Sequence, residues 1–316
     1  MADNYNNIKA YVNYVSKISP TGLTKFGRGD WVPVKSTSSL EYTSSIYFYV
    51  DATILSKAAA LFGHKKDEVY YSRLAVESRK AINDKYFNKI NCTYGSGVQT
   101  ELSMALQWNI VPDEYRVKLA ENLARRVAKD GMHLDVGVLG AKAILNALSA
   151  NGQAETAYKL ASQDTYPSWG WWIVNGATTL YENWDINAAR DISLNHMMFG
   201  DIGSWFFKGI GGINVDEKHP GFQNVILKPN FVEGLNYFIS KHNGPYGTII
   251  SSWKRQKNTI IYDVTVPANS TADISIPQVQ SFKVYLNGVI CKNQMSYHMA
   301  AGTYQFKLVD FHLKTQ

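Results

Sequence analysis

Apolar residues recur at helical spacing through the first two thirds of the chain. Ile8, Val12 and Val15 lie four and three residues apart, which places them near one face of a helix. The same periodicity predicts further helices at 39–62, 66–87, 99–108, 113–129, 138–150, 154–161 and 193–207. Their alternating short and long connections indicate helical hairpins in an α/α toroid, whose long loops line one mouth. A stack of helical repeats is the alternative, but the sequence shows no internal period that supports it.

After about residue 215 the pattern changes to the two-residue period of β-strands. Val264 and Val266 alternate with polar residues before the turn-forming sequence PANST. Further along, the Asn287–Gly288 pair in FKVYLNGV is a strong signal for a β-hairpin. We therefore predict a partial (α/α)6 toroid of eight or nine helices over residues 1–214 and an antiparallel β-sandwich over 215–316. The β module has no carboxylate–aromatic cluster, which favours a structural role over a weak sugar-binding surface.

Composition adds an aromatic surplus to this picture. The 316 residues include 20 Tyr and 8 Trp, while charged residues make up only 18%. Flat aromatic faces stack on sugar rings, but a large core explains the same surplus, so composition leaves both open. The net charge of +6 is dispersed, and the one basic cluster, 253–257, is expected to be a solvated hairpin. Neither a nucleic-acid partner nor insertion into a membrane is predicted, because no apolar run approaches the ~18 residues of a membrane span.

Several chemistries lack a signature in this sequence. The seven His are isolated, and Cys92 and Cys291 lie far apart, so neither a metal nor another cofactor is expected and the redox state of the thiols stays open. The glycine-rich GIGGIN follows a predicted helix rather than a strand, which excludes a dinucleotide fingerprint. The first residues lack the basic and apolar regions of an export signal, and the compartment is undetermined.

One carboxylate lies within the most aromatic stretch of the chain, YPSWGWWIVNGATTLYENWD, residues 166–185. This stretch holds four Trp, and Glu182 stands between Tyr181 and Trp184. Hydrolysis of a glycosidic bond needs carboxyl groups beside the bond and a pocket that grips the ring. A buried glutamate held by backbone amides is an equally good interpretation of Glu182, and Asp185 fits an ordinary turn.

Three further segments contain candidate polar residues. GRGDWVP is a tight loop that presents Asp30 and Trp31, although a turn capped by Asp30 explains it equally well. In MHLDVGVLG, Asp135 precedes a helix and fits the commoner role of an N-cap. In SLNHMMFG, His196 begins an apolar helix, where a histidine is more often a core residue than a ligand.

Six segments, in this order and spacing, resemble the catalytic half of bacterial α-L-rhamnosidases, glycoside hydrolase family 78. They are FGRGDWVP, YGSGVQTELSMAL, HLDVGVLG, YPSWGWWIVNGATTLYENWD, SLNHMMFGDIGSWFFKGIGGI and PGFQNVILKP. The tail, from GPYGTIISSWKR through VTVPANSTADISIP, resembles the β-sandwich that follows the (α/α)6 barrel in that family. The resemblance covers nearly the whole chain and implies inverting hydrolysis of terminal α-L-rhamnosides.

The resemblance also implies roles for individual residues. Glu182 corresponds to the general base that activates water, Trp31 lines the rhamnose pocket, and His196 contacts the sugar near the base. We expect these three side chains to share one aromatic-walled hollow. All the substrate-binding residues implied by the resemblance are Trp31, His196, Asp30, Trp169, Trp171 and Asp135.

The sequence departs from the family at the general acid. That residue belongs to an acidic, Arg-containing loop followed by Gly-Trp, which has no equivalent here, and eight or nine predicted helices stand where the family has twelve. The resemblance therefore implies the C-terminal part of a rhamnosidase that acts on a rhamnose-containing glycoside or polysaccharide. We expect the isolated chain to be nearly inactive; a non-catalytic rhamnose-binding remnant and one half of a split hydrolase are the alternatives. An open arc of helices also predicts self-association or docking of a missing N-terminal half.

Overall fold

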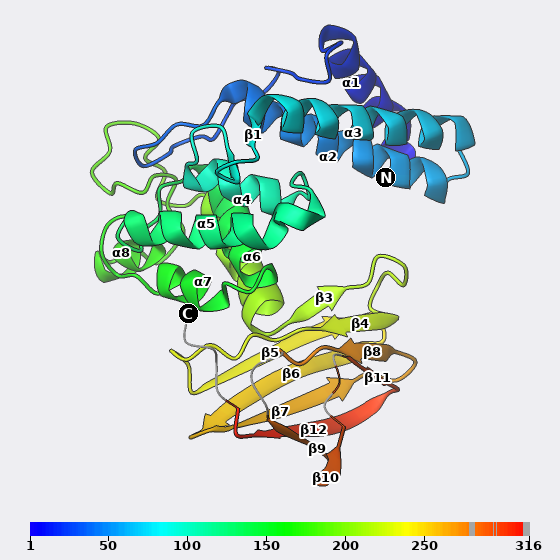
Figure 1. Cartoon of the computed structure of the whole chain (residues 1–316), viewed down its shortest axis with the longest axis vertical. Coiled ribbons are helices and arrows are strands. Elements are labelled where there is room, and N and C mark those ends of the chain that lie inside the picture. The colour runs from blue at the N-terminus through cyan, green and yellow to red at the C-terminus, as the bar shows by residue number, and fades with distance from the viewer. Residues whose placement is uncertain (278–281, 293, 295, 312–316) are drawn as a thin grey trace. The chain divides into compact units, whose positions relative to one another are not determined.

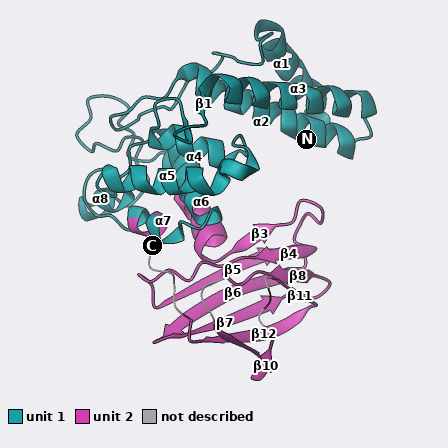
Figure 2. Cartoon of the chain, viewed as in Figure 1, with its two compact units in different colours: residues 1–156, 160–200 teal, residues 157–159, 201–316 magenta. Residues whose placement is uncertain are grey.

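The computed structural model describes residues 1–277, 282–292, 294 and 296–311, which form two compact units (Figure 2). The first unit comprises residues 1–156 and 160–200, and the second comprises 157–159 and 201–316. The boundary expected after residue 214 falls inside the second unit, so a domain division at that residue stays a prediction.

The chain is helical up to about residue 210 (Figure 1). Short 3-10 turns η1 (Ala2–Asn4), η2 (Asp113–Tyr115) and η3 (Met197–Phe199), a π turn η4 (Phe206–Ile210) and a small β1–β2 hairpin (Phe87–Asn88, Thr93–Tyr94) complete this part. The nine α-helices among the described residues are α1 (Tyr5–Ile18), α2 (Leu40–Leu61), α3 (Lys65–Tyr86), α4 (Gln99–Gln107), α5 (Arg116–Lys129), α6 (Val138–Ala150), α7 (Ala154–Ala161), α8 (Trp169–Val174) and α9 (Asp201–Trp205).

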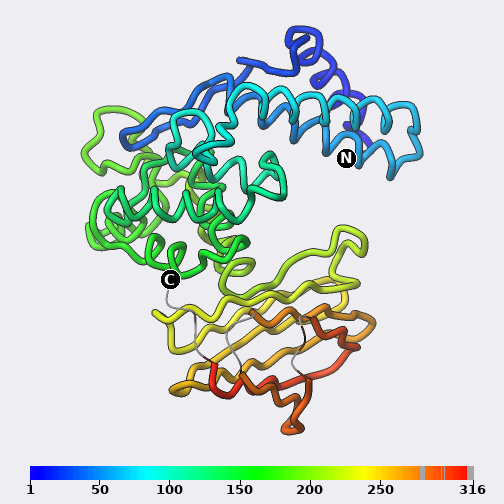
Figure 3. The backbone as a smooth tube through the Cα atoms, in the orientation of Figure 1, coloured from blue at the N-terminus to red at the C-terminus, as the bar shows by residue number. Residues whose placement is uncertain are grey.

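The first three helices pack through the apolar face that the sequence predicted. Val12 and Val15 of α1 are buried against Phe48 of α2 and Tyr71 of α3. The antiparallel run of α2 and α3 is the long pair traced in Figure 3. Each of these contacts removes apolar surface of both helices from water. This burial, more than the intrinsic helix propensity of the residues, stabilises the hairpin.

Helices α4 and α6 are buried on nearly every side, and they pack against each other. By contrast, α5 buries only one stripe, which contains Leu119, Leu123 and Val127. Inner and outer helices therefore alternate along the chain, as expected for the layers of a toroid. Helix α2 is also an inner helix. The segments at the starts of α2, α4 and α6 lie together, so that Asp30 contacts Thr100 and Gly137.

The helix predicted at 193–207 is wrong as a single element. Residues 193–196 are not helical: the backbone N–H of His196 donates to Leu180 O (2.8 Å), and Glu182 N–H donates to Ser193 O (2.9 Å). Helical structure begins only at η3 and continues as α9 and η4. The short helix α8, within the aromatic stretch, was not predicted.

The second unit contains two sheets whose apolar sides face each other. The larger has the strand order β10-β9-β12-β7-β6-β5 and the smaller the order β11-β8-β4-β3. Tyr297 of the smaller sheet packs on Phe306 of the larger, with ring centroids 5.2 Å apart. The strands are β3 (Ile213–Val215), β4 (Asn224–Leu227), β5 (Tyr237–Gly244), β6 (Gly247–Gln256), β7 (Thr259–Val266), β8 (Thr271–Ile274), β9 (Lys283–Leu286), β10 (Val289–Cys291), β11 (Tyr297–Met299) and β12 (Gly302–Val309).

The predicted fold class, a partial helical toroid followed by a β-sandwich, is confirmed. The Asn287–Gly288 turn joins β9 to β10, and both of its residues have positive φ (49° and 83°), as a type I′ turn requires. One detail differs from a purely antiparallel sandwich, since β4 pairs parallel to β8. Every helix of the described residues is too short or too polar to span a bilayer.

Candidate active site

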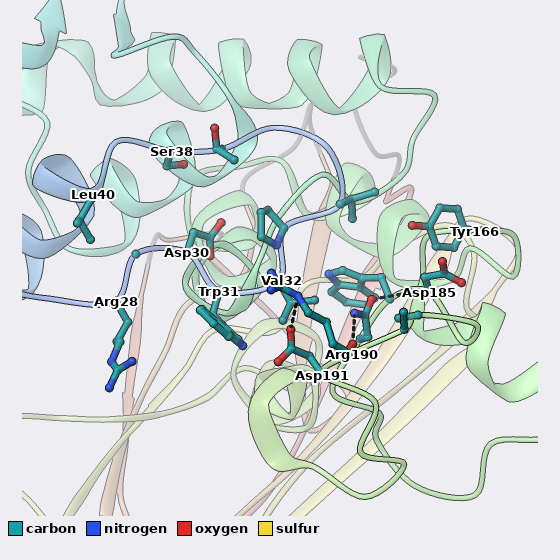
Figure 4. A pocket seen from close by; sticks show the side chains of 18 residues that line it. Arg28, Asp30, Trp31, Val32, Ser38, Leu40, Tyr166, Asp185, Arg190 and Asp191 are labelled. Carbon is teal, nitrogen blue, oxygen red and sulfur yellow. Dashed lines mark hydrogen bonds and ion pairs between the residues drawn. The ribbon is translucent and has the colours of Figure 1, made fainter.

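Two loops that are distant in sequence enclose a cavity of about 570 Å³ in the first unit (Figure 4). One loop connects α1 to α2 and contributes residues 28–38, together with Leu40 at the start of α2; the other follows α8 and contributes residues 183–191. Trp31 and Val32 of the first loop face Arg190 and Asp191 of the second in Figure 4. The remaining lining residues are Arg28, Gly29, Asp30, Pro33, Val34, Thr37, Ser38, Leu40, Tyr166, Asn183, Trp184, Asp185, Ala188 and Ala189.

Asp30 fastens the first loop to the start of α6. Its carboxylate accepts four hydrogen bonds, from Thr100 Oγ1 (2.5 Å) and from the backbone amides of Gly137 (2.8 Å), Leu139 (2.7 Å) and Gly140 (3.2 Å). Burial raises the pKa of Asp30, and these hydrogen bonds act in the opposite direction. Because both carboxylate oxygens are fully used as acceptors, Asp30 has a structural role at a helix N-terminus.

Asp135 fastens the other end of the same loop. It accepts hydrogen bonds from the backbone amides of Lys35 (2.9 Å) and Ser36 (3.0 Å) and from Ser36 Oγ (2.5 Å), and it lies 3.6 Å from the Arg126 guanidinium. Burial raises the pKa of Asp135, but the Ser36 and Lys35 hydrogen bonds and the Arg126 charge outweigh burial and lower the pKa overall. The predicted N-cap role is not seen, since the N-cap of α6 is Gly137.

The two buried carboxylates leave Trp31 in a defined position. Its carbonyl accepts a hydrogen bond from Val138 N–H (2.9 Å), and its side chain is 41% exposed on the cavity. Gly137 permits this close approach, because a Cβ there would lie 2.3 Å from Trp31 O. An exposed indole on a rigid loop is a suitable platform for stacking a flat or ring-shaped ligand.

Buried aromatic rings support the second loop. Trp184 is 1% exposed and stacks on Trp172 with ring centroids 4.9 Å apart at 18°. Its indole N–H donates to Val136 O (2.8 Å), immediately before α6. The 183–191 loop is therefore connected to the same helix start that holds Asp30.

Glu182 directly precedes cavity-lining Asn183, but is not itself among the lining residues. Its Oε2 accepts a hydrogen bond from Ser193 N–H (3.2 Å), and the side chain is half-buried. A half-buried carboxylate held by one amide retains free acceptor positions, which a general base requires.

The other predicted site residues lie around the cavity rather than on it. His196 is the N-cap of η3, where its Nδ1 accepts from Met198 N–H (3.1 Å). Trp169 is buried, and its indole N–H donates to Phe199 O (3.0 Å). Its ring packs edge-on against cavity-lining Trp184. Trp171 is half-buried and packs edge-on against Tyr166, at a centroid distance of 6.3 Å. The expectation that Glu182, Trp31 and His196 line one hollow is not met by this cavity, because only Trp31 lines it.

Sequence reasoning missed the residues that donate hydrogen bonds to the carboxylates of Asp30 and Asp135. Thr100, Gly137 and Ser36 have ordinary sequence contexts, and their partners lie 70 to 107 residues away. The signal that was available is an acid close to a glycine, in GRGD within the loop before α2 and in LDVG directly before α6.

Comparisons with known proteins identify this architecture. A model of the bacterial alpha-L-rhamnosidase six-hairpin glycosidase domain matches residues 1–210, and a model of the bacterial alpha-L-rhamnosidase C-terminal domain matches residues 212–287. The helical part thus belongs to the six-hairpin glycosidase class of domain, and a β-sandwich domain follows it. The chain belongs to the family of bacterial α-L-rhamnosidases, which confirms the resemblance seen in the sequence.

Several relatives show how much of the family this chain covers. An α-L-rhamnosidase of Formosa agariphila is 27% identical over 97% of the chain and 36% of its own length. The solved α-L-rhamnosidase from Dictyoglumus thermophilum has a TM-score of 0.89 and 30% identity over 98% of the chain and 37% of its own length. That of Streptomyces avermitilis, complexed with L-rhamnose, has a TM-score of 0.87 and 26% identity over 97% of the chain and 30% of its own length. The chain therefore spans about a third of the length of these relatives.

Proposed function

We propose that this chain supplies the base side of an α-L-rhamnosidase site, which hydrolyses terminal α-L-rhamnosides with inversion. Membership of the rhamnosidase family over residues 1–210 is the observation that carries this proposal. Glu182 activates the attacking water, and the exposed face of Trp31 holds the sugar ring. His196 and Trp171 complete the surroundings of the base, and the substrate is a rhamnose-containing glycoside.

The hydrogen bonding of Glu182 supports this role. Ser193 N–H holds one oxygen of its carboxylate, and the following residues Asn183 and Trp184 reach the cavity wall. A base restrained in this way keeps one oxygen available to take a proton from water on one face of the sugar. Inversion additionally requires an acid on the opposite side, with the two carboxyl groups roughly 6.5–9.5 Å apart.

The two buried carboxylates beside the cavity loop, Asp30 and Asp135, are already engaged and are not free to replace the acid. Asp30 accepts four hydrogen bonds and Asp135 accepts three in addition to its ion pair with Arg126. The lowered pKa of Asp135 makes it a poor proton donor. Burial raises the pKa of Asp30, but its four hydrogen bonds hold the loop, and protonation would break at least one of them. We therefore expect the chain by itself to lack protonation of the leaving oxygen, which contributes about 10²–10⁴ to the rate.

The choice of leaving group tests the proposal. A 2,4-dinitrophenolate departs without protonation, so 2,4-dinitrophenyl α-L-rhamnoside should be hydrolysed slowly by the isolated chain, whereas methyl α-L-rhamnoside should not. Glu182→Gln should abolish the slow reaction, while Glu77→Gln, an exposed change on α3, should leave it unchanged. Proton NMR of the first product should show the β-anomer of rhamnose.

Other outcomes distinguish the alternatives. Turnover that survives Glu182→Gln overturns the assignment of the base, and efficient hydrolysis of the methyl glycoside overturns the missing acid. A non-catalytic rhamnose-binding module is the second candidate, which the engagement of Asp30 and Asp135 favours. Binding of L-rhamnose with no turnover of either substrate identifies it, and activity restored by a separate N-terminal half identifies a split hydrolase.

A further inference from the structure

The fold fixes the backbone on both sides of Arg28 through a separate contact or conformation at each neighbouring residue. Gly27 packs so closely on α2 that a Cβ would lie 2.4 Å from Ser44 Oγ. Gly29 has a φ of +78°, a conformation that side chains disfavour. Asp30 accepts its four hydrogen bonds, and the Trp31 carbonyl accepts from Val138 N–H (2.9 Å). The backbone that carries Arg28 is therefore rigid on both sides.

The Arg28 side chain, by contrast, does not help to hold the loop in place. Its side chain is exposed on the cavity, and it forms no hydrogen bond or ion pair with any residue in the described part of the chain. The other cavity arginine differs, because Arg190 lies 3.5 Å from the carboxylate of Asp191. A rigid loop thus presents an uncompensated guanidinium to a cavity, although that group contributes no contact to the fold.

The position of Arg28 limits what it can bind. Arg28 and Trp31 leave the loop on the same side in Figure 4, three positions apart in sequence. The two acids of the facing loop differ: Asp191 lies beside Trp31 in Figure 4 but is paired with Arg190, and Asp185 lies near Tyr166, on the far side of Trp31 from Arg28. An anionic group on the Arg28 side of Trp31 would therefore meet an uncompensated guanidinium, while the carboxylate on the other side of Trp31 is already paired with Arg190.

The chemistry of guanidinium narrows the ligand class. Its planar fork of N–H donors matches the two oxygens of a carboxylate or sulfate, and charge-assisted bonds of this kind are about twice as strong as neutral ones. A neutral hydroxyl would use a single donor and leave the charge unpaired.

We propose that Arg28 is a specificity residue that binds a carboxylate or sulfate on the group attached to the rhamnose. The sugar ring lies on Trp31, and the anion on the attached group reaches the Arg28 fork. The substrate class is then an anionic rhamnoside. This inference rests on the proposed function, because it takes the rhamnose site at Trp31 as given.

Matched, non-hydrolysable ligands test the inference by calorimetry on the intact chain. The 4-carboxyphenyl and 4-carbamoylphenyl thio-α-L-rhamnosides have nearly the same shape and differ in charge, and a 4-sulfophenyl analogue represents the sulfate class. We expect both anions to bind about three- to tenfold more tightly than the amide at low salt. This preference should shrink between about 50 mM and about 500 mM NaCl, because the pair is exposed to solvent.

Substitutions assign the preference to one residue. Arg28→Gln should reduce the ratio of anion to amide affinity to about one, and Arg28→Lys should keep part of it, since the charge remains but the fork is lost. Arg73→Gln, which removes an exposed arginine of α3 outside the cavity, should leave the ratio unchanged. An unaltered ratio in Arg28→Gln, or equal affinities for anion and amide in the wild type, overturns the inference.

The same titrations separate this inference from the proposed function. Binding of the amide ligand that is lost in Trp31→Ala supports the sugar site whether or not Arg28 matters. Amide binding that Trp31→Ala does not affect overturns the rhamnose site at Trp31 and, with it, the role of Arg28. Absence of binding by all three ligands overturns both.

Discussion

The carboxylate of Asp30 accepts a hydrogen bond of 2.8 Å from the backbone amide of Gly137, a residue 107 positions further along the chain. This bond joins the loop before α2 to the N-terminus of α6, and Asp135 strengthens the junction by accepting from Lys35 and Ser36 of the same loop. The position of Trp31 on the cavity depends on these long-range contacts rather than on the loop alone.

Substitution of Asp30 by Asn should destabilise the first unit. Each carboxylate oxygen of Asp30 accepts two hydrogen bonds, so in either orientation the amide NH₂ of Asn would face donors. We expect a loss of about 2–4 kcal/mol in the free energy of unfolding, measured by urea denaturation with tryptophan fluorescence. Asp3→Asn, at an exposed position, serves as the control. An Asp30→Asn protein that is as stable as the wild type but inactive would instead make Asp30 a catalytic group.

Gly137→Ala should disturb the same junction from the other side. The added Cβ would lie 2.3 Å from Trp31 O and 2.8 Å from Asp30 O, and both of these atoms are backbone. We expect a loss of about 1–3 kcal/mol in stability together with weaker ligand binding at Trp31, because the loop must move outward. Gly203→Ala is the control, because a Cβ added there would have no atom within 4 Å. Gly63 is unsuitable for this purpose, since its φ of 74° disfavours any side chain. Unchanged binding by Gly137→Ala would show that the loop position does not matter for the site.

Two tryptophans of the cavity should respond differently to truncation. Trp31 is 41% exposed, whereas Trp184 is 1% exposed and stacks on Trp172. Trp31→Ala should lower affinity for rhamnosides at least about tenfold while changing stability by less than about 1 kcal/mol. Trp184→Ala should instead cost about 3–5 kcal/mol of stability. Calorimetry and denaturation on both variants check this, and a reversal of the two effects would contradict the assigned roles.

Asp51 should make the first unit more stable in mild acid. This α2 carboxylate has no hydrogen-bond or ion-pair partner among the described residues, and burial raises its pKa to about 6. The unfolded pKa is near 3.9. Because the folded pKa is the higher one, the destabilisation from ionised Asp51 is present above about pH 6 and disappears as the pH falls toward about 4.

Asp51→Asn removes that titration. At about pH 7 the variant should be more stable than the wild type by about 1–3 kcal/mol, and this difference should be smaller at about pH 5. Urea denaturation at both pH values measures it, and Asp84→Asn on the exposed face of α3 controls for general effects of charge. A difference that does not depend on pH would show that Asp51 has an ordinary pKa.

Local patterns predicted most of the secondary structure, since periodicity reports which side of a helix or strand is buried. The helices expected at 138–150 and 154–161 have the same bounds in the structure. The prediction was wrong at 193–196, where the amide of His196 donates to Leu180 and the backbone at Glu182 pairs with Ser193. Those partners are supplied by a separate segment, which no local pattern of apolar residues reveals.

The sequence by itself determined the two periods, the aromatic surplus around Glu182 and the family resemblance, because each depends on residue types at short or ordered spacing. Only the tertiary structure decided which acids are structural. Asp30 and Glu182 both stand beside a tryptophan-rich or glycine-rich segment, yet Asp30 accepts four buried hydrogen bonds, whereas one backbone amide holds the Glu182 side chain. A carboxylate becomes structural when the fold brings enough donors to it, and those donors come from helices distant in the chain.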